Sequence, residues 1–292
     1  MATRPPQERP PAVLDIEMQL RSLDNAGLDL SVLTCGAGFD IGDAELCRVV
    51  NDAMHESLAP YQGRFQTLAH VPLLDGKEAI RELERCVGEY GLKGVVIKSE
   101  YETLTLDSPE LNPFWEACER LNVYVFMHGA MWPAVGPHLD VSDLVRALGR
   151  EYSISTAIYR LIFGGVLDRF PNLKIQVGHL GGHAAIYLSR VEGFGEREKW
   201  GTVGDPRHGQ RPEKPLRHYL AERLWFDTAG LFGSVDVIRA ALLMIPKSQI
   251  VFGTDCPVEI REDSDLISFI AAIRALPEGE AILSGNAKAL LG

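Results

Sequence analysis

Short apolar segments alternate along the chain with longer segments whose apolar residues recur at helical spacing. The short segments have the length and composition of buried strands, and the longer ones carry charged residues between their apolar positions. This alternation is typical of parallel α/β folds, in which a helix follows each strand. The pattern predicts strands at 28–35, 65–73, 95–99, 123–128, 173–179, 224–228 and 249–255.

The segments between these strands are predicted to be helices. Ile80, Leu83 and Val87 share one face of the segment 77–90, and Gly91 suits the end of that helix. A further helix precedes the first strand and ends at Gly27. The predicted helices cover 15–26, 43–61, 77–90, 112–121, a segment ending near 170, a segment beginning near 181, 234–245 and 263–276.

Repeated strand–helix units over 292 residues favour a (β/α)8 barrel of the TIM type. Nothing ahead of the first helix has a strand pattern, so we expect the first strand to be missing or replaced. We treat 1–292 as one barrel domain whose proline-rich segment 1–13 is flexible. The segments 130–140 and 193–215 interrupt the alternation, and loops of this length are either functional lids and partner contacts or surface excursions.

Composition excludes several classes of partner and location. The chain has 29 Lys and Arg against 40 Asp and Glu, a net charge of -11, and no basic run, which argues against nucleic acid. No apolar stretch is long enough to span a bilayer and the N-terminal segment has no apolar signal core, so we expect a cytoplasmic protein. The 5 cysteines form no Cys-x-x-Cys pair and are predicted to be reduced core residues.

Three predicted strands end in a residue that can bind a metal or transfer a proton: His128, His179 and Asp255. The active site of a parallel barrel lies at the C-terminal ends of its strands, so we expect these side chains to converge. Two imidazoles and a carboxylate suit zinc, iron or manganese. Alternatively, His128 and Asp255 are the ligands and His179 is an acid–base catalyst. Spacing alone leaves both assignments open.

Two further histidines are weaker candidates. His183 follows His179 at a ligand-like spacing, but a helix that begins near Gly181 separates the two, so a surface or supporting position is favoured. His70 lies in the middle of a predicted strand, where it either faces the site or belongs to the core.

Arg190 and Trp132 are the predicted substrate-binding residues. Arg190 follows the His179 loop on a predicted helix, where an arginine can grip a carboxylate or simply face solvent. Trp132 lies in the interruption at 130–140. Cys256, next to Asp255, is better explained as a small buried residue than as a catalytic thiolate.

Several longer blocks carry a more specific signal: FQTLAHVPLLD (65–75), NPFWEACERLNVYVFMHG (112–129), FGGVLDRFPNLKIQVGHLGG (163–182), VFGTDCP (251–257) and ILSGNAKALLG (282–292). Together they resemble the amidohydrolase-related family that includes aminocarboxymuconate-semialdehyde decarboxylase and the resorcylate-type decarboxylases. The resemblance implies a (β/α)8 barrel, a single divalent metal, often zinc, and chemistry on small carboxylated or aromatic molecules. By match of motif it implies that His128 and Asp255 are metal ligands and that His179 is catalytic.

The sequence departs from that family at its first strand, which bears His-x-His or Glu-x-His and supplies two more ligands. This chain contains no His-x-His and begins just after the place expected for that strand. Two explanations stay open: the sequence begins late relative to the functional gene product, or the protein has given up tight metal binding. The second leaves metal-free acid–base chemistry by His179 and Asp255, or a scaffold without a reaction.

We therefore predict a metal-dependent enzyme of this superfamily, a non-oxidative decarboxylase of a small carboxylic acid. His179 and Asp255 are its predicted catalytic residues, and His128 and Asp255 hold a divalent metal, zinc. The alternatives are a hydrolase or hydratase of a small lactone, ester or unsaturated acid, and a metal-free or non-catalytic relative. An incomplete barrel leaves two strand edges to be covered by the N-terminal segment or by a partner chain, and we predict a homodimer.

Overall fold

The computed structural model describes residues 13, 15–134, 136–195 and 211–291. Apart from Val13, the segment 1–13 that is predicted to be flexible lies outside these residues, and so does the stretch 196–210 of the interruption at 193–215. No helix in the described part of the chain is long and apolar enough to cross a membrane.

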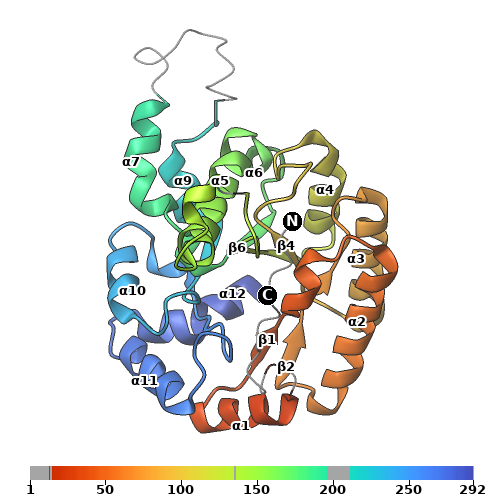
Figure 1. Ribbon diagram of the computed structural model, residues 1–292, viewed down its shortest axis with the longest axis vertical. Helices are drawn as coiled ribbons and strands as arrows, with labels where there is room; N and C mark the ends of the chain where they lie inside the picture. The colour runs from red at the N-terminus through yellow and green to blue at the C-terminus, as the bar shows by residue number, and fades with distance from the viewer. Residues whose placement is uncertain (1–12, 14, 135, 196–210, 292) are drawn as a thin grey trace.

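Parallel strands form the centre of the molecule, and their order in space follows their order in the sequence (Figure 1). One pair joins β1 (Ser31–Leu33) to β2 (Phe65–Thr67). A second sheet holds β3 (Ala69–His70), β4 (Gly94–Lys98), β5 (Tyr124–His128), β6 (Lys174–Val177), β7 (Leu224–Asp227) and β8 (Ile250–Val251). Every pairing is parallel. The predicted fold class, α/β of the barrel type, is confirmed, although no ladder joins β8 to β1 among the described residues.

The strands differ from the prediction in length. The single strand predicted at 65–73 is wrong, because β2 pairs with β1 whereas β3 pairs with β4, and Leu68 separates the two. Pro72 lacks the N–H that would extend a ladder beyond this point. Strand β6 stops before His179 and β8 stops well before Asp255, so neither residue is the last of its strand.

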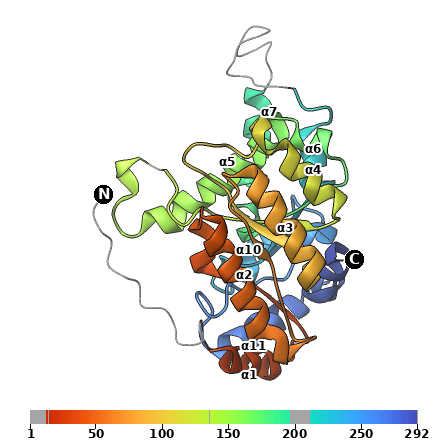
Figure 2. The same cartoon turned by 90° about the vertical axis from the view of Figure 1, so that its right-hand side faces the viewer.

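Helices surround the strands, with α2 and α3 on one side and α10 and α11 on the other (Figures 1 and 2). Aspartates cap the N-termini of α1, α2 and α3. Gly27 and Gly91 end α1 and α3 in left-handed conformation, as the sequence predicts. The helices are α1 (Ile16–Ala26), α2 (Ala44–Leu58), α3 (Gly76–Tyr90), α4 (Asn112–Arg120), α5 (Arg150–Phe163), α6 (Val166–Arg169), α7 (Ala184–Phe194), α9 (Leu216–Glu222), α10 (Val235–Ala241), α11 (Asp263–Arg274) and α12 (Asn286–Leu291).

Proline and glycine explain where the helices depart from the prediction. The helix expected over 43–61 ends at Leu58, just before Pro60, and a 3₁₀ turn follows. The helix expected to end near 170 is divided into α5 and α6 at Gly165, which has a φ of 71°. The helix expected near 181 begins only at Ala184, because Gly182 takes a φ of 60°.

The first and last parts of the fold are joined through their helices. Helix α1 packs against α11, and Ser22 and Asn25 of α1 donate hydrogen bonds of 2.6 and 2.7 Å to the carboxylate of Asp263. Figure 1 shows the two helices side by side at one end of the molecule. This contact ties the β1 end of the strand series to the β8 end without a strand ladder.

Side chains alternate between the helical layer and the interior of the strand array. Met127 of β5 packs in the main core with the helices, whereas Tyr124 and Phe126 pack in a separate cluster with Leu290 of α12. Because successive strand residues point to opposite faces, His128 points to the same side as Phe126. The end of β5 therefore delivers an imidazole to the interior of the barrel.

Candidate active site

His128 ends β5 as a neutral imidazole. Its Nδ1 lies 2.7 Å from the carbonyl oxygen of Gly129, which can only accept, so Nδ1 carries the hydrogen. Burial, together with the positive charges of His179 and Arg150, lowers the pKa of His128 to about 3. Phe39 stacks on the ring at 4.5 Å between centroids. The Nε2 lone pair of His128 is consequently free to bind an electrophile, because no described residue hydrogen-bonds to it.

His179 lies at the centre of the cluster and is held from two directions. Its backbone N–H donates to Asp227 Oδ1 at 3.0 Å, and its ring Nδ1 lies 2.7 Å from Glu151 Oε1. The ring faces that of His128 edge-on, with 5.5 Å between centroids. Gly230 packs so closely that a Cβ there would lie 2.3 Å from the His179 ring, which fixes the position of the imidazole.

His179 is protonated at neutral pH. Burial alone would lower the pKa of His179, but the hydrogen bond and charge of Glu151, with the charges of Asp227 and Asp255, raise it to about 9. A histidine ordinarily titrates near 6.5, so the neighbouring carboxylates keep this one as an imidazolium. The two histidines therefore differ in charge although their rings are in contact, so the neutral His128 can act as a ligand and the charged His179 can donate a proton.

Asp255 lies in the loop beyond β8, with a φ of 50° that holds it in left-handed conformation. The pKa of its carboxyl group is raised, mainly by burial and also by the negative charge of Asp227. The positive charges of His179 and Arg150 act in the opposite direction. This coupling places Asp255 in the same region as His179. No hydrogen bond to the Asp255 carboxylate is formed within the described part of the chain.

The start of α5 is fixed to the strand ends by serines. Ser153 bonds to Ser99 at 2.7 Å, and Ser99 in turn accepts the backbone N–H of Ala130 at 2.9 Å. Ser155 accepts the backbone N–H of His183 at 2.7 Å. A Cβ on Gly182 would lie 2.4 Å from the carbonyl oxygen of Glu151, so only glycine allows this approach. Glu151 is thereby held beside His179.

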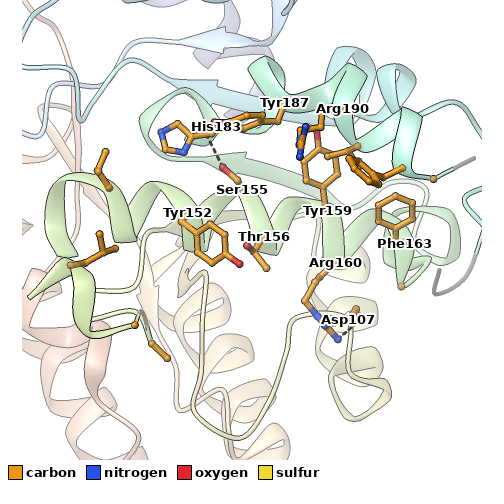
Figure 3. Close-up of a pocket in the computed structure, with 18 of the residues that line it drawn as sticks. Asp107, Tyr152, Ser155, Thr156, Tyr159, Arg160, Phe163, His183, Tyr187 and Arg190 are labelled. Carbon is orange, nitrogen blue, oxygen red and sulfur yellow. Dashed lines mark hydrogen bonds and ion pairs between the residues drawn. The ribbon is translucent and has the colours of Figure 1, made fainter. Parts of the chain in front are cut away.

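Arg190 and His183 lie elsewhere, in a groove between α5 and α7 with a volume of about 1770 Å³ (Figure 3). The Arg190 guanidinium lies 4.9 Å from the centre of the Phe194 ring. Tyr152 and Tyr187 also line the groove, whereas His128, His179 and Asp255 do not. Trp132 follows β5 and is 45% exposed. The structure therefore does not bring Arg190 to the histidines, and the substrate-binding roles of Arg190 and Trp132 stay predictions.

The surroundings of Cys256 and His70 argue against a catalytic role for either residue. Cys256 is only half-buried, so the prediction of a buried residue is wrong, but partial burial still raises the pKa of its thiol to about 11 and disfavours the thiolate. His70 is buried, and its Nε2 accepts the backbone N–H of Cys35 at 3.2 Å. Burial lowers the pKa of His70 to about 4, so it is a neutral core residue.

Comparison with known proteins identifies the family. Residues 36–292 match the family described as amidohydrolase. The chain belongs to the amidohydrolase family. It is 30% identical over 288 residues to 2-amino-3-carboxymuconate-6-semialdehyde decarboxylase of Dictyostelium discoideum, covering 95% of this chain and 77% of that protein. The resemblance predicted from the sequence is confirmed.

Solved structures support the same relationship for this amidohydrolase. The 2,6-dihydroxybenzoate decarboxylase from Rhizobium matches with a TM-score of 0.81 and 25% identity, over 94% of this chain and 87% of that one. A dihydroxybenzoic acid decarboxylase from Polaromonas matches with a TM-score of 0.79 and 25% identity, over 94% of this chain and 85% of that one. The Polaromonas structure holds manganese and the inhibitor 2-nitroresorcinol.

The amidohydrolase site offers part of a metal-binding set. His128 Nε2 and the Asp255 carboxylate are donors that no described residue occupies, and both atoms suit a divalent cation. The described residues contain no group of three or more His, Cys, Asp or Glu side chains that could hold a metal ion. His128 and Asp255 therefore suit a divalent metal as two of its ligands, and the described residues do not supply the remaining ligands.

Three residues of this amidohydrolase site were missed by the sequence analysis. Asp227 ends β7, so the strand-end argument that selected His128 could have found it. Glu151 and Arg150 begin α5, and nothing in the sequence shows which strand ends a helix approaches.

Proposed function

We propose that the chain is a non-oxidative decarboxylase that removes the carboxyl group of a small aromatic or unsaturated carboxylic acid. The observation that carries the proposal is the charge difference between the paired histidines: an imidazolium at His179, held by Glu151 at 2.7 Å, faces the neutral imidazole of His128. Such a proton donor is what a carbon centre needs after it has lost carbon dioxide. The activities named for the relatives support the same reaction.

In this reaction the bond between the substrate carbon and its carboxylate breaks, and the electron pair stays on that carbon. Carbon dioxide leaves as a neutral molecule. The Nε2 proton of His179 then moves to the carbon, and the imidazole regains a proton from water. Glu151 orients the ring through Nδ1 and stabilises the imidazolium before the proton is transferred.

His128 and Asp255 are the residues that would hold a divalent metal. When bound, such an ion supplies a positive charge that holds substrate oxygens and stabilises the electron pair left on the carbon. Nitrogen and oxygen donors suit both zinc and manganese, so the preference for zinc stays a prediction.

Turnover in D₂O tests the reaction directly. Purified protein loaded with Mn²⁺ or Zn²⁺ should release one carbon dioxide from an acid in a panel of hydroxybenzoates and unsaturated carboxylic acids that includes 2,6-dihydroxybenzoate. The product should carry one deuterium at the vacated carbon by NMR. The rate should be highest while His179 is protonated and should fall as the pH rises through about 9. A product that has gained water and kept its carboxyl group would identify a hydratase or hydrolase instead.

Glu151→Gln provides the matched test of the pH dependence. The glutamine keeps the shape but removes the negative charge that raises the pKa of His179, so the alkaline fall in rate should move to lower pH. Glu116→Gln, an exposed position on α4, should leave the profile in place. An unchanged profile in Glu151→Gln would show that Glu151 does not control the proton of His179.

We also propose that the protein is a homodimer and that it is cytoplasmic, as expected from the sequence. Support for the dimer comes from the apolar face of α5 and α7, where Tyr152, Ile186 and Tyr187 are 62%, 71% and 52% exposed. Light scattering should give a dimer mass for the natural chain and a monomer mass for the double variant Tyr152→Glu/Tyr187→Glu. Leu243→Glu, 86% exposed after α10, should stay dimeric. A monomeric natural chain at micromolar concentration would contradict this proposal.

A further inference from the structure

Arg150 is a cation at the catalytic centre that the proposed reaction does not yet use. It is the first residue of α5, directly before Glu151. Its guanidinium is half-buried and makes two long hydrogen bonds, of 3.4 Å from Nε and 3.3 Å from Nη2, both to the carbonyl oxygen of Met131. Its remaining N–H groups form no hydrogen bond with any described residue.

Packing and charge place Arg150 beside the candidate ligands. A Cβ added to Gly129, the residue after His128, would lie 3.3 Å from the Cβ of Arg150. The guanidinium interacts electrostatically with both His128 and Asp255. Any molecule held between the two histidines and Asp255 therefore lies within the field of this cation.

Two other arginines of this region form salt bridges, whereas Arg150 forms none with a described residue. Arg146 forms an ion pair with Asp143, and Arg160 donates to both carboxylate oxygens of Asp107 at 2.7 and 3.1 Å. The charges of Asp255, Asp143 and Glu151 nevertheless favour the positive charge of Arg150. A half-buried guanidinium that no carboxylate contacts directly is stabilised when an anion reaches it. The helix does not need Arg150 for its position, because Ser153 and Ser155 already fix the start of α5. A π-helical turn over Val145–Gly149 also precedes it, an irregularity that is frequent at functional sites.

The chemistry of decarboxylation decides which anion suits Arg150. A carboxylate that leaves as carbon dioxide loses its charge, so a fixed cation on it would stabilise the substrate more than the transition state. An arginine cannot give up its own charge, and its planar donors suit a carboxylate that keeps both oxygens. The favourable partner is an anionic group that remains on the product.

We propose that Arg150 binds a second anionic group of the substrate, one that the product retains. This inference rests on the proposed function and narrows the substrate class to dicarboxylic acids and acids with a further anionic oxygen. Arg150 then sets which end of the substrate faces His179.

Binding measurements on the Mn²⁺-loaded protein test this without turnover. The probes are phthalate, isophthalate and terephthalate, each compared with benzoate by calorimetry. The natural chain should bind at least one dicarboxylate about 10- to 100-fold more tightly than benzoate, the range expected of charge-assisted hydrogen bonds. Arg150→Gln should remove that preference and leave benzoate affinity unchanged. Arg150→Lys should keep part of it, because lysine keeps the charge but not the fork.

Arg146→Gln is the matched control, because it removes a nearby positive charge that is already paired with Asp143. It should keep the dicarboxylate preference, and circular dichroism should show all variants folded. Equal losses for benzoate and dicarboxylate in Arg150→Gln, or no preference in the natural chain, would overturn the proposal. Failure of the proposed function would instead appear as the absence of carbon dioxide release, which these titrations do not measure.

Discussion

His179→Asn should lower kcat by about 10²- to 10⁴-fold, the range that general acid catalysis contributes. The substitution removes the imidazolium that Glu151 and the neighbouring carboxylates maintain. Asparagine still offers a polar side chain near Glu151, and the backbone N–H that binds Asp227 is unaffected. We therefore expect bound metal and the melting temperature to change little, so that the loss lies in the chemical step.

The measurement is the steady-state rate of carbon dioxide release, with metal content and circular dichroism of the same preparation. His218→Asn is the matched control, because its imidazole interacts with Glu222 on α9 and not with the catalytic cluster. If His179→Asn turned over normally and still placed deuterium on the product, another group would be the proton donor.

Removing either candidate ligand should abolish metal binding and, with it, turnover. Asp255→Asn keeps the shape of the side chain but not its charge, and His128→Ala removes the free Nε2. Outer-shell partners of a metal already contribute 10- to 100-fold to its affinity, so loss of a direct ligand should exceed about 100-fold. Elemental analysis should show about one equivalent of metal in the natural chain and almost none in either variant.

A chelator should inactivate the natural chain, and added Mn²⁺ or Zn²⁺ should restore its activity. Cys256→Ser is the control next to Asp255. Burial raises the pKa of the Cys256 thiol to about 11 and keeps it protonated, so replacing the thiol should not change the metal content. Full occupancy in Asp255→Asn and His128→Ala would mean that the metal is held by other residues.

The residues brought together at the strand ends could be anticipated from periodicity alone. His128 shares the parity of Tyr124 and Phe126 on β5, and a parallel barrel places the ends of its strands around one opening. His179 and Asp255 were expected to be the last residues of their strands, but β6 and β8 end earlier and both residues lie in the following loops with positive φ angles. The sequence pattern showed the strands but not where pairing stops.

The partners of these residues could not be anticipated in the same way. Glu151 reaches His179 because α5 approaches the loop after β6 at Gly182, a contact that depends on tertiary packing. Arg190 was expected near the histidines but lies away from them. The turn at Gly182 sets the direction of α7, and the Arg190 guanidinium lies over the Phe194 ring. Hydrophobic periodicity indicates which face of a helix is buried, but not which loop that face meets.

The two glycines that crowd His179 and Glu151 also bear on how such an enzyme can acquire new specificity. Gly182 and Gly230 have positive φ angles, and any β-carbon there would collide with the Glu151 backbone or with the imidazole. Mutant libraries should find both positions intolerant, whereas Trp132, which is 45% exposed after β5, should tolerate substitution. Altered substrate range is thus expected to evolve through the segment after β5, while Glu151 and His179 are inherited unchanged.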